Sequence, residues 1–154
     1  MSEISRTALF GKLNPIAYKA IESATVFCKL RGNPYVELEH WFAQLLQAQD
    51  TDLHHIIRHY GLDSAVVAKD LTAALDRLPR GATAISDFSQ NIEMAIERAW
   101  TYATLKFGDA QVRTGYLLLA MLKMQNLRVA LLSISRQFEK IKPENFSENF
   151  DTIC

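Results

Sequence analysis

Three histidines lie close together in the sequence and have a spacing that zinc sites use. His55 and His59 are four residues apart, which would place both imidazoles on one face of a helix. A zinc site needs further ligands, and no acidic residue or cysteine follows at a suitable spacing nearby. The pattern therefore favours solvated helix residues at His54, His55 and His59, with metal binding as the alternative.

Residues that could support catalysis are scattered along the chain. Asp50, Asp52 and Asp109 fall at expected turns and caps, and no carboxylate pair or Ser-His-Asp set converges. The sequence has no Gly-x-x-x-x-Gly-Lys-[Ser/Thr] loop that would hold ATP and magnesium. Cys28 and Cys154 have no metal spacing and make no disulfide framework. We expect no catalytic residue, metal site or cofactor in this segment.

Composition limits the class of protein. The chain has 154 residues, 49% of them apolar, which is enough for one compact domain over residues 1–154. Lysine plus arginine equals aspartate plus glutamate at 17 each, so charge gives no reason to expect nucleic acid or a membrane as partner. No apolar run approaches the roughly 18 residues of a membrane span, and the N-terminus lacks a signal-peptide pattern. A cytoplasmic setting is expected.

The chain contains an internal repeat. Gly32 matches Gly108 and Val36 matches Val112 at an offset of 76, and each pair opens a stretch that leads into a strongly apolar helix. Before them, two stripes of mostly small residues share the spacing 4, 3, 4, 4 at an offset of 75: Leu13, Ala17, Ala20, Ala24 and Cys28, and Phe88, Ile92, Ala95, Ala99 and Ala103. This periodicity is typical of helices that pack closely against a neighbour.

The repeat predicts an all-α fold with two pseudo-duplicated four-helix units and an additional N-terminal helix. The leading helix is expected over residues 2–12, capped by Ser2. Repeat one covers about 13–78, a Pro- and Gly-containing linker covers 79–87, and repeat two covers about 88–153. No stretch alternates with period two, so no sheet is expected.

Local signals place the helix boundaries. In repeat two, the third helix is expected to include Val129 and Phe138, and the fourth to start near Pro143. The residues expected to cap helices are Asn14, Asp63 or Ser64, Ser89 and Thr114.

These residues resemble the N-terminal domain of Clp-type AAA+ unfoldases. The resemblance is carried by Val36-x-x-Glu39-His40-aromatic followed by Leu45-Leu46, and it covers nearly the whole chain. The second repeat has Gly115-Tyr116 where the first has Glu39-His40. The leading segment and the Gly32-Asn33-Pro34 turn are most similar to the ClpV branch, from bacterial type VI secretion.

The resemblance implies a partner. Domains of this branch bind an N-terminal helix of the large subunit of the contracted tail sheath, in a groove between the leading helix and the following helix. ATPase rings elsewhere in the parent chain, with ATP and magnesium, then take the sheath apart. The parent is expected to be hexameric and the isolated domain monomeric, with no nucleic acid and no membrane as partner.

A second apolar stripe suggests where the groove lies. Ile16, Ala20, Ser23, Phe27 and Leu30 run beside the first stripe, and a short leading helix could cover only part of them. The alternatives are that this stripe is ordinary core and that Phe88 is plain core. His40 is expected to be structural. The residues predicted to form the peptide-binding groove are Leu9, Leu13, Ile16, Ala20, Ser23, Ala24, Phe27 and Phe88.

Two other functions fit the sequence less well. The N-domain of a general protein-quality-control Clp chaperone would bind unfolded proteins or an adaptor. A stand-alone helical enzyme or small-molecule binder is the third reading.

Overall fold

The computed structural model describes residues 4–154. The first half of the chain follows the predicted order, with a leading helix and then four helices. Its elements are α1 Arg6–Phe10, α2 Pro15–Arg31, β1 Tyr35–Val36, α3 Leu38–Gln47, α4 Asp52–His59 and α5 Ser64–Asp76.

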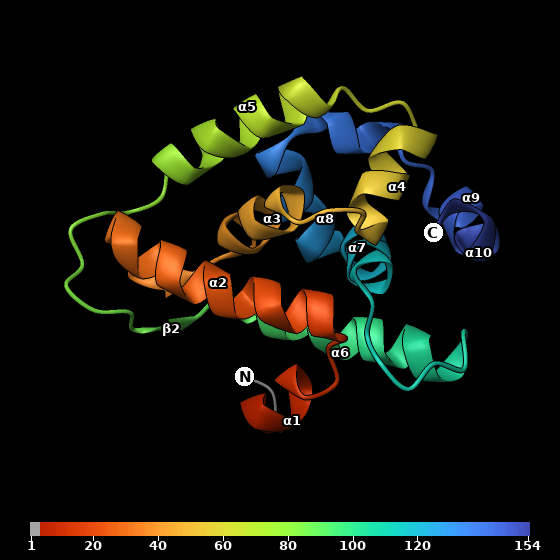
Figure 1. Cartoon of the computed structure of the whole chain (residues 1–154), viewed down its shortest axis with the longest axis horizontal. Coiled ribbons are helices and arrows are strands. Elements are labelled where there is room, and N and C mark those ends of the chain that lie inside the picture. Colours follow the sequence, from red (N-terminus) through yellow and green to blue (C-terminus); the bar gives the residue numbers. More distant parts are fainter. Residues whose placement is uncertain (1–3) are drawn as a thin grey trace.

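The second half repeats this order with shorter final elements. It contains β2 Asp87–Phe88, α6 Gln90–Leu105, α7 Thr114–Lys123, α8 Gln125–Ile134, the 3-10 helix η1 Arg136–Lys140, α9 Pro143–Glu148 and α10 Phe150–Ile153. Helices α3, α7 and α8 lie in the middle of the molecule, between α2 and α6 on one side and α5 on the other (Figure 1). The prediction of an all-α, duplicated fold is confirmed.

The two halves are tied together by a reciprocal pairing of their loops. Val36 pairs with Phe88 in the parallel two-residue strands β1 and β2, and Val112 forms a parallel bridge with Leu13. Val36 and Val112 are equivalent positions in the two repeats, and so are Leu13 and Phe88. In each half, the valine therefore pairs with the residue that comes just before the long helix α2 or α6 of the other half. The expectation of no sheet misses β1 and β2, because strands this short have no periodicity to detect.

The small-residue stripes of both halves face the core, as predicted. Every member of the first stripe is at most 7% exposed, and the equivalent helix α6 buries Ile92, Ala95, Ala99 and Ala103 completely. Central side chains from both halves meet around one small interior void. Its lining includes Leu38, Trp41, Phe42 and Leu45 of α3 and Leu117, Leu118 and Met121 of α7. The core is therefore shared between the halves.

Several predicted boundaries were wrong. Ser2 lies outside the described residues, and Ser5 caps α1, where its side chain accepts from the N–H of Ala8. Phe138 belongs to η1 instead of the third helix of repeat two, because Ser135 is extended and ends α8. The predicted fourth helix is broken at Asn149 into α9 and α10. Val129 is 60% exposed and points away from the core.

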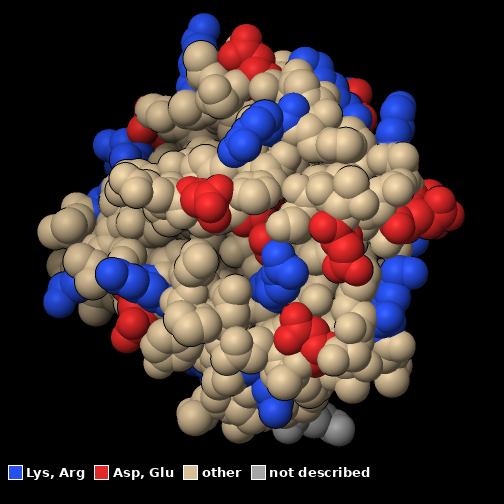
Figure 2. All heavy atoms as spheres, turned by 45° about the vertical axis from the view of Figure 1, so that its right-hand side comes forward, with Lys and Arg blue, Asp and Glu red and all other residues tan. Residues whose placement is uncertain are grey.

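The surface mixes both signs of charge. Figure 2 shows acidic and basic side chains interspersed over one face, in keeping with the zero net charge. Among residues 4–154, no helix is by itself long and apolar enough to span a membrane. The bent pair α7–α8, at 108°, reaches that length and composition only when taken together.

Candidate functional site

Helix α2 carries the uncovered apolar stripe that the sequence predicts. Ile16 is 44% exposed and Leu30 is 81% exposed, while Ser23 and Phe27 are half-buried. Ala20 lies at the edge of the core, at 7% exposure. The interpretation of this stripe as ordinary core is therefore wrong for its outer members. The stripe leaves an apolar edge of α2 open along most of its length.

A hollow of about 400 Å³ lies beside this edge. Its second wall comes from the C-terminal end of α3 and the loop that follows. The small side chains of Ala20, Ser23 and Ala48 leave the space that a partner side chain would fill. The full lining is Ile16, Lys19, Ala20, Ser23, Gln44, Gln47, Ala48 and Gln49.

Local chemistry fixes both walls of the hollow. The Asn14 side chain accepts from the N–H of Ala17 at 2.9 Å and starts α2, and Gly32, at φ 71°, ends it. The indole Nε1 of Trp41 in α3 donates to the carbonyl of Ala17 at 3.2 Å. Because Trp41 is buried, this hydrogen bond holds α3 firmly against α2.

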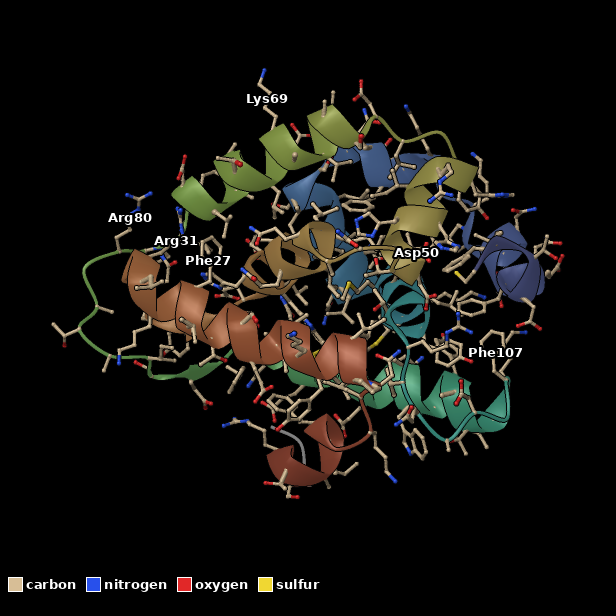
Figure 3. All side chains as sticks on the ribbon, in the orientation of Figure 1. Phe27, Arg31, Asp50, Lys69, Arg80 and Phe107 are labelled. Carbon is tan, nitrogen blue, oxygen red and sulfur yellow. The ribbon has the colours of Figure 1, made fainter. Side chains whose placement is uncertain are left out.

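Phe27 marks the other end of the α2–α3 seam. Its ring meets the imidazole of His40 edge-on at 5.9 Å, and the Arg31 guanidinium lies over it at 5.7 Å. Arg31 in turn pairs with Asp76 at 2.9 Å. Figure 3 shows Phe27 and Arg31 together at the C-terminal end of α2. The exposed part of Phe27 therefore continues the apolar edge toward Leu30.

The structure brings only some of the predicted groove residues together. Leu9, Leu13 and Ala24 are 3%, 4% and 0% exposed, so they offer almost no surface to a ligand in this conformation. Helix α1 packs mainly on α6, where the Phe10 ring meets Phe88 edge-on at 5.0 Å. The hollow next to α2 is thus walled by α3, whereas the sequence analysis expected α1.

Phe88, also predicted to line the groove, does not line the hollow beside α2. Helix α2 begins beside Val112, whereas α6 begins beside Val36, which follows the end of α2. The two helix starts therefore lie at opposite ends of the α2 region, and Phe88 sits under α1.

The residues of the α3 wall are absent from the groove that the sequence analysis predicted. Gln44 and Gln47 are one helical turn apart, so the spacing does place them on one face of α3. Nothing in the sequence indicates that this face lies beside Ile16 and Ser23. That proximity comes from the crossing of α2 and α3.

His40 confirms its predicted structural role. It is 0% exposed, its Nδ1 accepts from the N–H of Glu37 at 2.9 Å, and its Nε2 lies 2.8 Å from Oδ1 of Asn33. An amide oxygen only accepts, so this network assigns the proton of the neutral ring to Nε2. Burial, and then the nearby Arg31 charge, lower the pKa of His40 to about 4. The ring is therefore neutral near pH 7.

The other histidines have separate partners. His54 Nδ1 lies 2.7 Å from the Thr51 hydroxyl, and His55 Nε2 lies 2.6 Å from Asp50. His59 packs against the ring of Tyr60 at 4.8 Å. His54 and His55 are half-buried and hydrogen-bonded instead of solvated, and His59 is exposed. No three His, Cys, Asp or Glu side chains gather as a metal site within residues 4–154.

The structure is therefore a duplicated helical domain in which α2 has an open apolar edge. Residues 12–133 match the family described as the Clp repeat (R) N-terminal domain, and the chain belongs to this family. A relative named AAA+ ATPase ClpV1, from Pseudomonas aeruginosa, is 64% identical over 151 residues, or 98% of this chain. Another, from Yersinia enterocolitica, is named chaperone protein ClpB and is 55% identical over 150 residues, or 97% of this chain.

Two solved structures are also similar to this chain. One, from work on the coevolution of ClpV, the TssB-TssC sheath and the accessory HsiE protein, is 63% identical with a TM-score of 0.96; the match covers 99% of this chain and 94% of that one. A complex of a ClpV N-domain with a VipB peptide is 25% identical with a TM-score of 0.85, covering 99% and 93%. The chain spans only 17% of the length of the two named relatives.

Proposed function

We propose that this domain recognises a helix at the N-terminus of the large sheath subunit of a type VI secretion system, along the open edge of α2. The observation that carries the proposal is the hollow between α2 and α3, beside exposed Ile16. The similarity to a ClpV N-domain solved with a VipB peptide supports a peptide as the ligand.

The dimensions of the edge suit a helical ligand. Ile16 and Leu30 are fourteen positions apart, which corresponds to about 21 Å along a helix at 1.5 Å per residue. A partner helix of about four turns would match this length, with apolar side chains at helical spacing entering the hollow and contacting Phe27. The described strands, with two residues each, offer too little edge for an extended peptide.

The role of the parent protein follows from this proposal. ATPase rings in the rest of the parent chain, with ATP and magnesium, would pull on the captured sheath and release its subunits in the cytoplasm. Support comes from the 64% identical relative, which is named as an AAA+ ATPase and is much longer than this chain. The parent would act as a hexamer, and the isolated domain would be a monomer that binds without hydrolysing.

A fluorescence titration with a labelled N-terminal peptide of the sheath large subunit tests the proposal. Ser23→Arg and Phe27→Glu should each weaken binding about 30-fold, because the first blocks the hollow and the second places a charge on the apolar edge of α2. Val129→Glu is the control: it changes an apolar residue on α8 that is 60% exposed, and it should leave affinity unchanged. If both α2 variants bind as tightly as the wild type while their circular dichroism is native, the site lies elsewhere.

A general quality-control role is the second candidate, favoured by the 55% identical relative named ClpB. A chemically denatured model protein should compete with the sheath peptide only if the domain binds unfolded chains. HsiE is included as a second competitor, because the 63% identical structure comes from work on the coevolution of that protein with ClpV and the sheath. Binding of HsiE or of denatured protein without binding of the sheath peptide would overturn the assignment of the partner.

A further inference from the structure

The hollow beside α2 has an unbalanced charge. Among residues 4–154, Lys19 is the one charged residue in its lining, and no acidic side chain from these residues lines it. Lys19 is exposed and forms no ion pair with any residue in the range 4–154, whereas Arg31 at the opposite end of α2 is held by Asp76. A cation on the rim of an otherwise uncharged hollow attracts an anionic group on whatever enters it.

The rest of the α3 wall is made of amides. The side chains of Gln44, Gln47 and Gln49 line the hollow, and none forms a hydrogen bond with another described residue. Each amide can donate and accept, so this wall accommodates polar groups of either kind. It supplies no second charge, which leaves Lys19 to set the sign of the partner.

Repeat two lacks this combination at the equivalent positions. Met94 stands where Lys19 stands, and Met124 stands where Ala48 stands. Both methionines are partly buried and pack on the core. Arg98 stands where repeat one has Ser23. A cation beside small side chains, as Lys19 lies beside Ala20 and Ala48, therefore occurs at these positions in repeat one and not in repeat two.

We infer that the hollow selects an amphipathic helix that carries an aspartate or glutamate opposite Lys19 and apolar side chains that fill the space beside Ala20 and Ala48. This inference rests on the proposed function, since it names the chemistry of the helix that binds there. The acidic side chain fixes the register of the partner along α2, because Lys19, the only charge that the described residues contribute to the lining, lies near the Ile16 end. The apolar side chains then supply most of the contact area, toward Phe27.

A charge-reversal experiment on the whole domain tests the inference. Lys19→Glu should weaken binding of the sheath N-terminal peptide about tenfold at low salt, since attraction is replaced by repulsion. Lys69→Glu is the matched control: Lys69 is exposed, forms no ion pair within residues 4–154 and extends away from α5 into solvent (Figure 3). Both variants change the net charge equally, so long-range effects cancel in the comparison.

A set of peptides locates the partner carboxylate. Each aspartate or glutamate of the sheath peptide is changed in turn to lysine, and the peptide that binds Lys19→Glu better than it binds the wild-type domain identifies the contact. Such a rescued pair supports the inference. Equal affinities for Lys19→Glu and Lys69→Glu, or no rescuing peptide, would overturn it and leave the proposed function intact. Failure of the wild-type domain to bind the peptide would overturn the proposed function itself.

Discussion

His40 joins the start of α3 to the linker through one buried polar chain. Its Nε2–H donates to Asn33, whose side-chain amide in turn donates to the carbonyl of Pro79 at 2.7 Å. Asn33 is 1% exposed, so these hydrogen bonds are shielded from water, and only the acceptor role of Nδ1 would be lost if His40 were protonated. Protonation would place a second donor on Nδ1, opposite the N–H of Glu37 that it now accepts from.

The stability of the domain should therefore fall with acidification. The pKa of His40 is about 4 in the folded state against about 6.5 when unfolded, so the unfolded state takes up protons first as the pH falls. The contribution of neutral His40 is complete above pH 6.5 and decreases from there down to pH 4. Urea unfolding at pH 7.5 and 5.5 should differ by about 1 to 2 kcal/mol from this group.

A His40→Gln variant isolates that contribution. The unfolding free energy of this variant will be lower than that of the wild type at both pH values. Its decrease in unfolding free energy between pH 7.5 and 5.5 should be smaller than the decrease in the wild type by about 1 to 2 kcal/mol. Burial raises the pKa of Glu37 and of Glu39, and this has the opposite effect on stability, because the folded state then holds protons more readily. Equal pH slopes for the two proteins would contradict the assignment to His40.

The role of His40 could be predicted from the sequence, but its partners could not. The Glu-His pair just before an apolar helix indicates a packed imidazole at the helix start. The contact between Asn33 and Pro79 joins positions 46 residues apart, and no local pattern encodes it. The same limit applies to the candidate site: Ile16, Ser23 and Phe27 follow from helical spacing, whereas Gln44 and Gln47 require the crossing of α2 and α3.

At the level of elements, α7 obtains its N-terminal cap from the other repeat. Thr114 was predicted to be the cap, but Arg113 holds that position and makes no side-chain cap bond. Instead Asp52, at the start of α4, accepts from the Gly115 N–H at 3.0 Å and from the Arg113 guanidinium at 2.8 and 3.2 Å. One carboxylate thus satisfies an orphan donor of α7 and a half-buried arginine.

Removing this carboxylate should be costly. The Asp52 side chain is 13% exposed, so Asp52→Ala would leave the Arg113 charge and the Gly115 N–H without their partner, and we expect a loss of about 2 kcal/mol of unfolding free energy. Asp76→Ala is the control, because Asp76 also pairs with arginine but is 56% exposed and should cost less than about 1 kcal/mol. Similar losses for the two variants would contradict the cross-repeat cap.

Gly115 is required for the approach of α10 to α7. A Cβ at this position would lie 2.6 Å from Cζ of Phe150 and 3.2 Å from Oδ2 of Asp52. Phe150 is 1% exposed and packs against Phe107 and Tyr116, so its ring has no room to move. Gly115→Ala should therefore destabilise the domain by about 1 to 3 kcal/mol, measured by urea unfolding.

The effect of the clash with Phe150 can be separated from other effects of replacing Gly115. In Phe150→Leu the crowding atoms of the ring are absent, so adding Gly115→Ala to that variant should cost at least 1 kcal/mol less than adding it to the wild type. A strictly additive double variant would show that the clash with Phe150 is not the cause. Repeat one has Glu39-His40 at the start of α3, whereas repeat two has Gly115-Tyr116 at the start of α7. This difference reflects the elements that pack on the two helix starts.

Sequence patterns predicted the long helices better than the short ones. The helical stripes of α2 and α6 identify both elements, because seventeen and sixteen residues give several turns of periodicity. Helix α1 has five residues, and its position on α6 depends on distant partners: Arg6 pairs with Asp87 at 2.7 Å, and Phe10 meets Phe88. For that reason the sequence did not indicate that α1 packs mainly on α6.

For the whole molecule, the reciprocal loop pairing makes two repeats into one core. Leu13, just before α2, is bridged to Val112, and Phe88, just before α6, pairs with Val36. The backbone at the start of each of these helices is therefore paired with the other half. Helix α4 packs on α7, and α5 packs on α8, across the same boundary. Each half therefore leaves a large apolar surface uncovered without the other, and the two should unfold together.

The two tryptophans report on this cooperativity separately, because Trp41 lies in α3 of the first half and Trp100 in α6 of the second. In Trp100→Phe the remaining fluorescence follows repeat one, and in Trp41→Phe it follows repeat two. Trp41 is 1% exposed and bonded to Ala17, so Trp41→Phe will shift the transition to lower urea. Within each variant, the normalised fluorescence curve should still coincide with that variant's own circular dichroism curve. A fluorescence transition that precedes the circular dichroism transition in either variant would show that one repeat unfolds independently, in contradiction to a shared core.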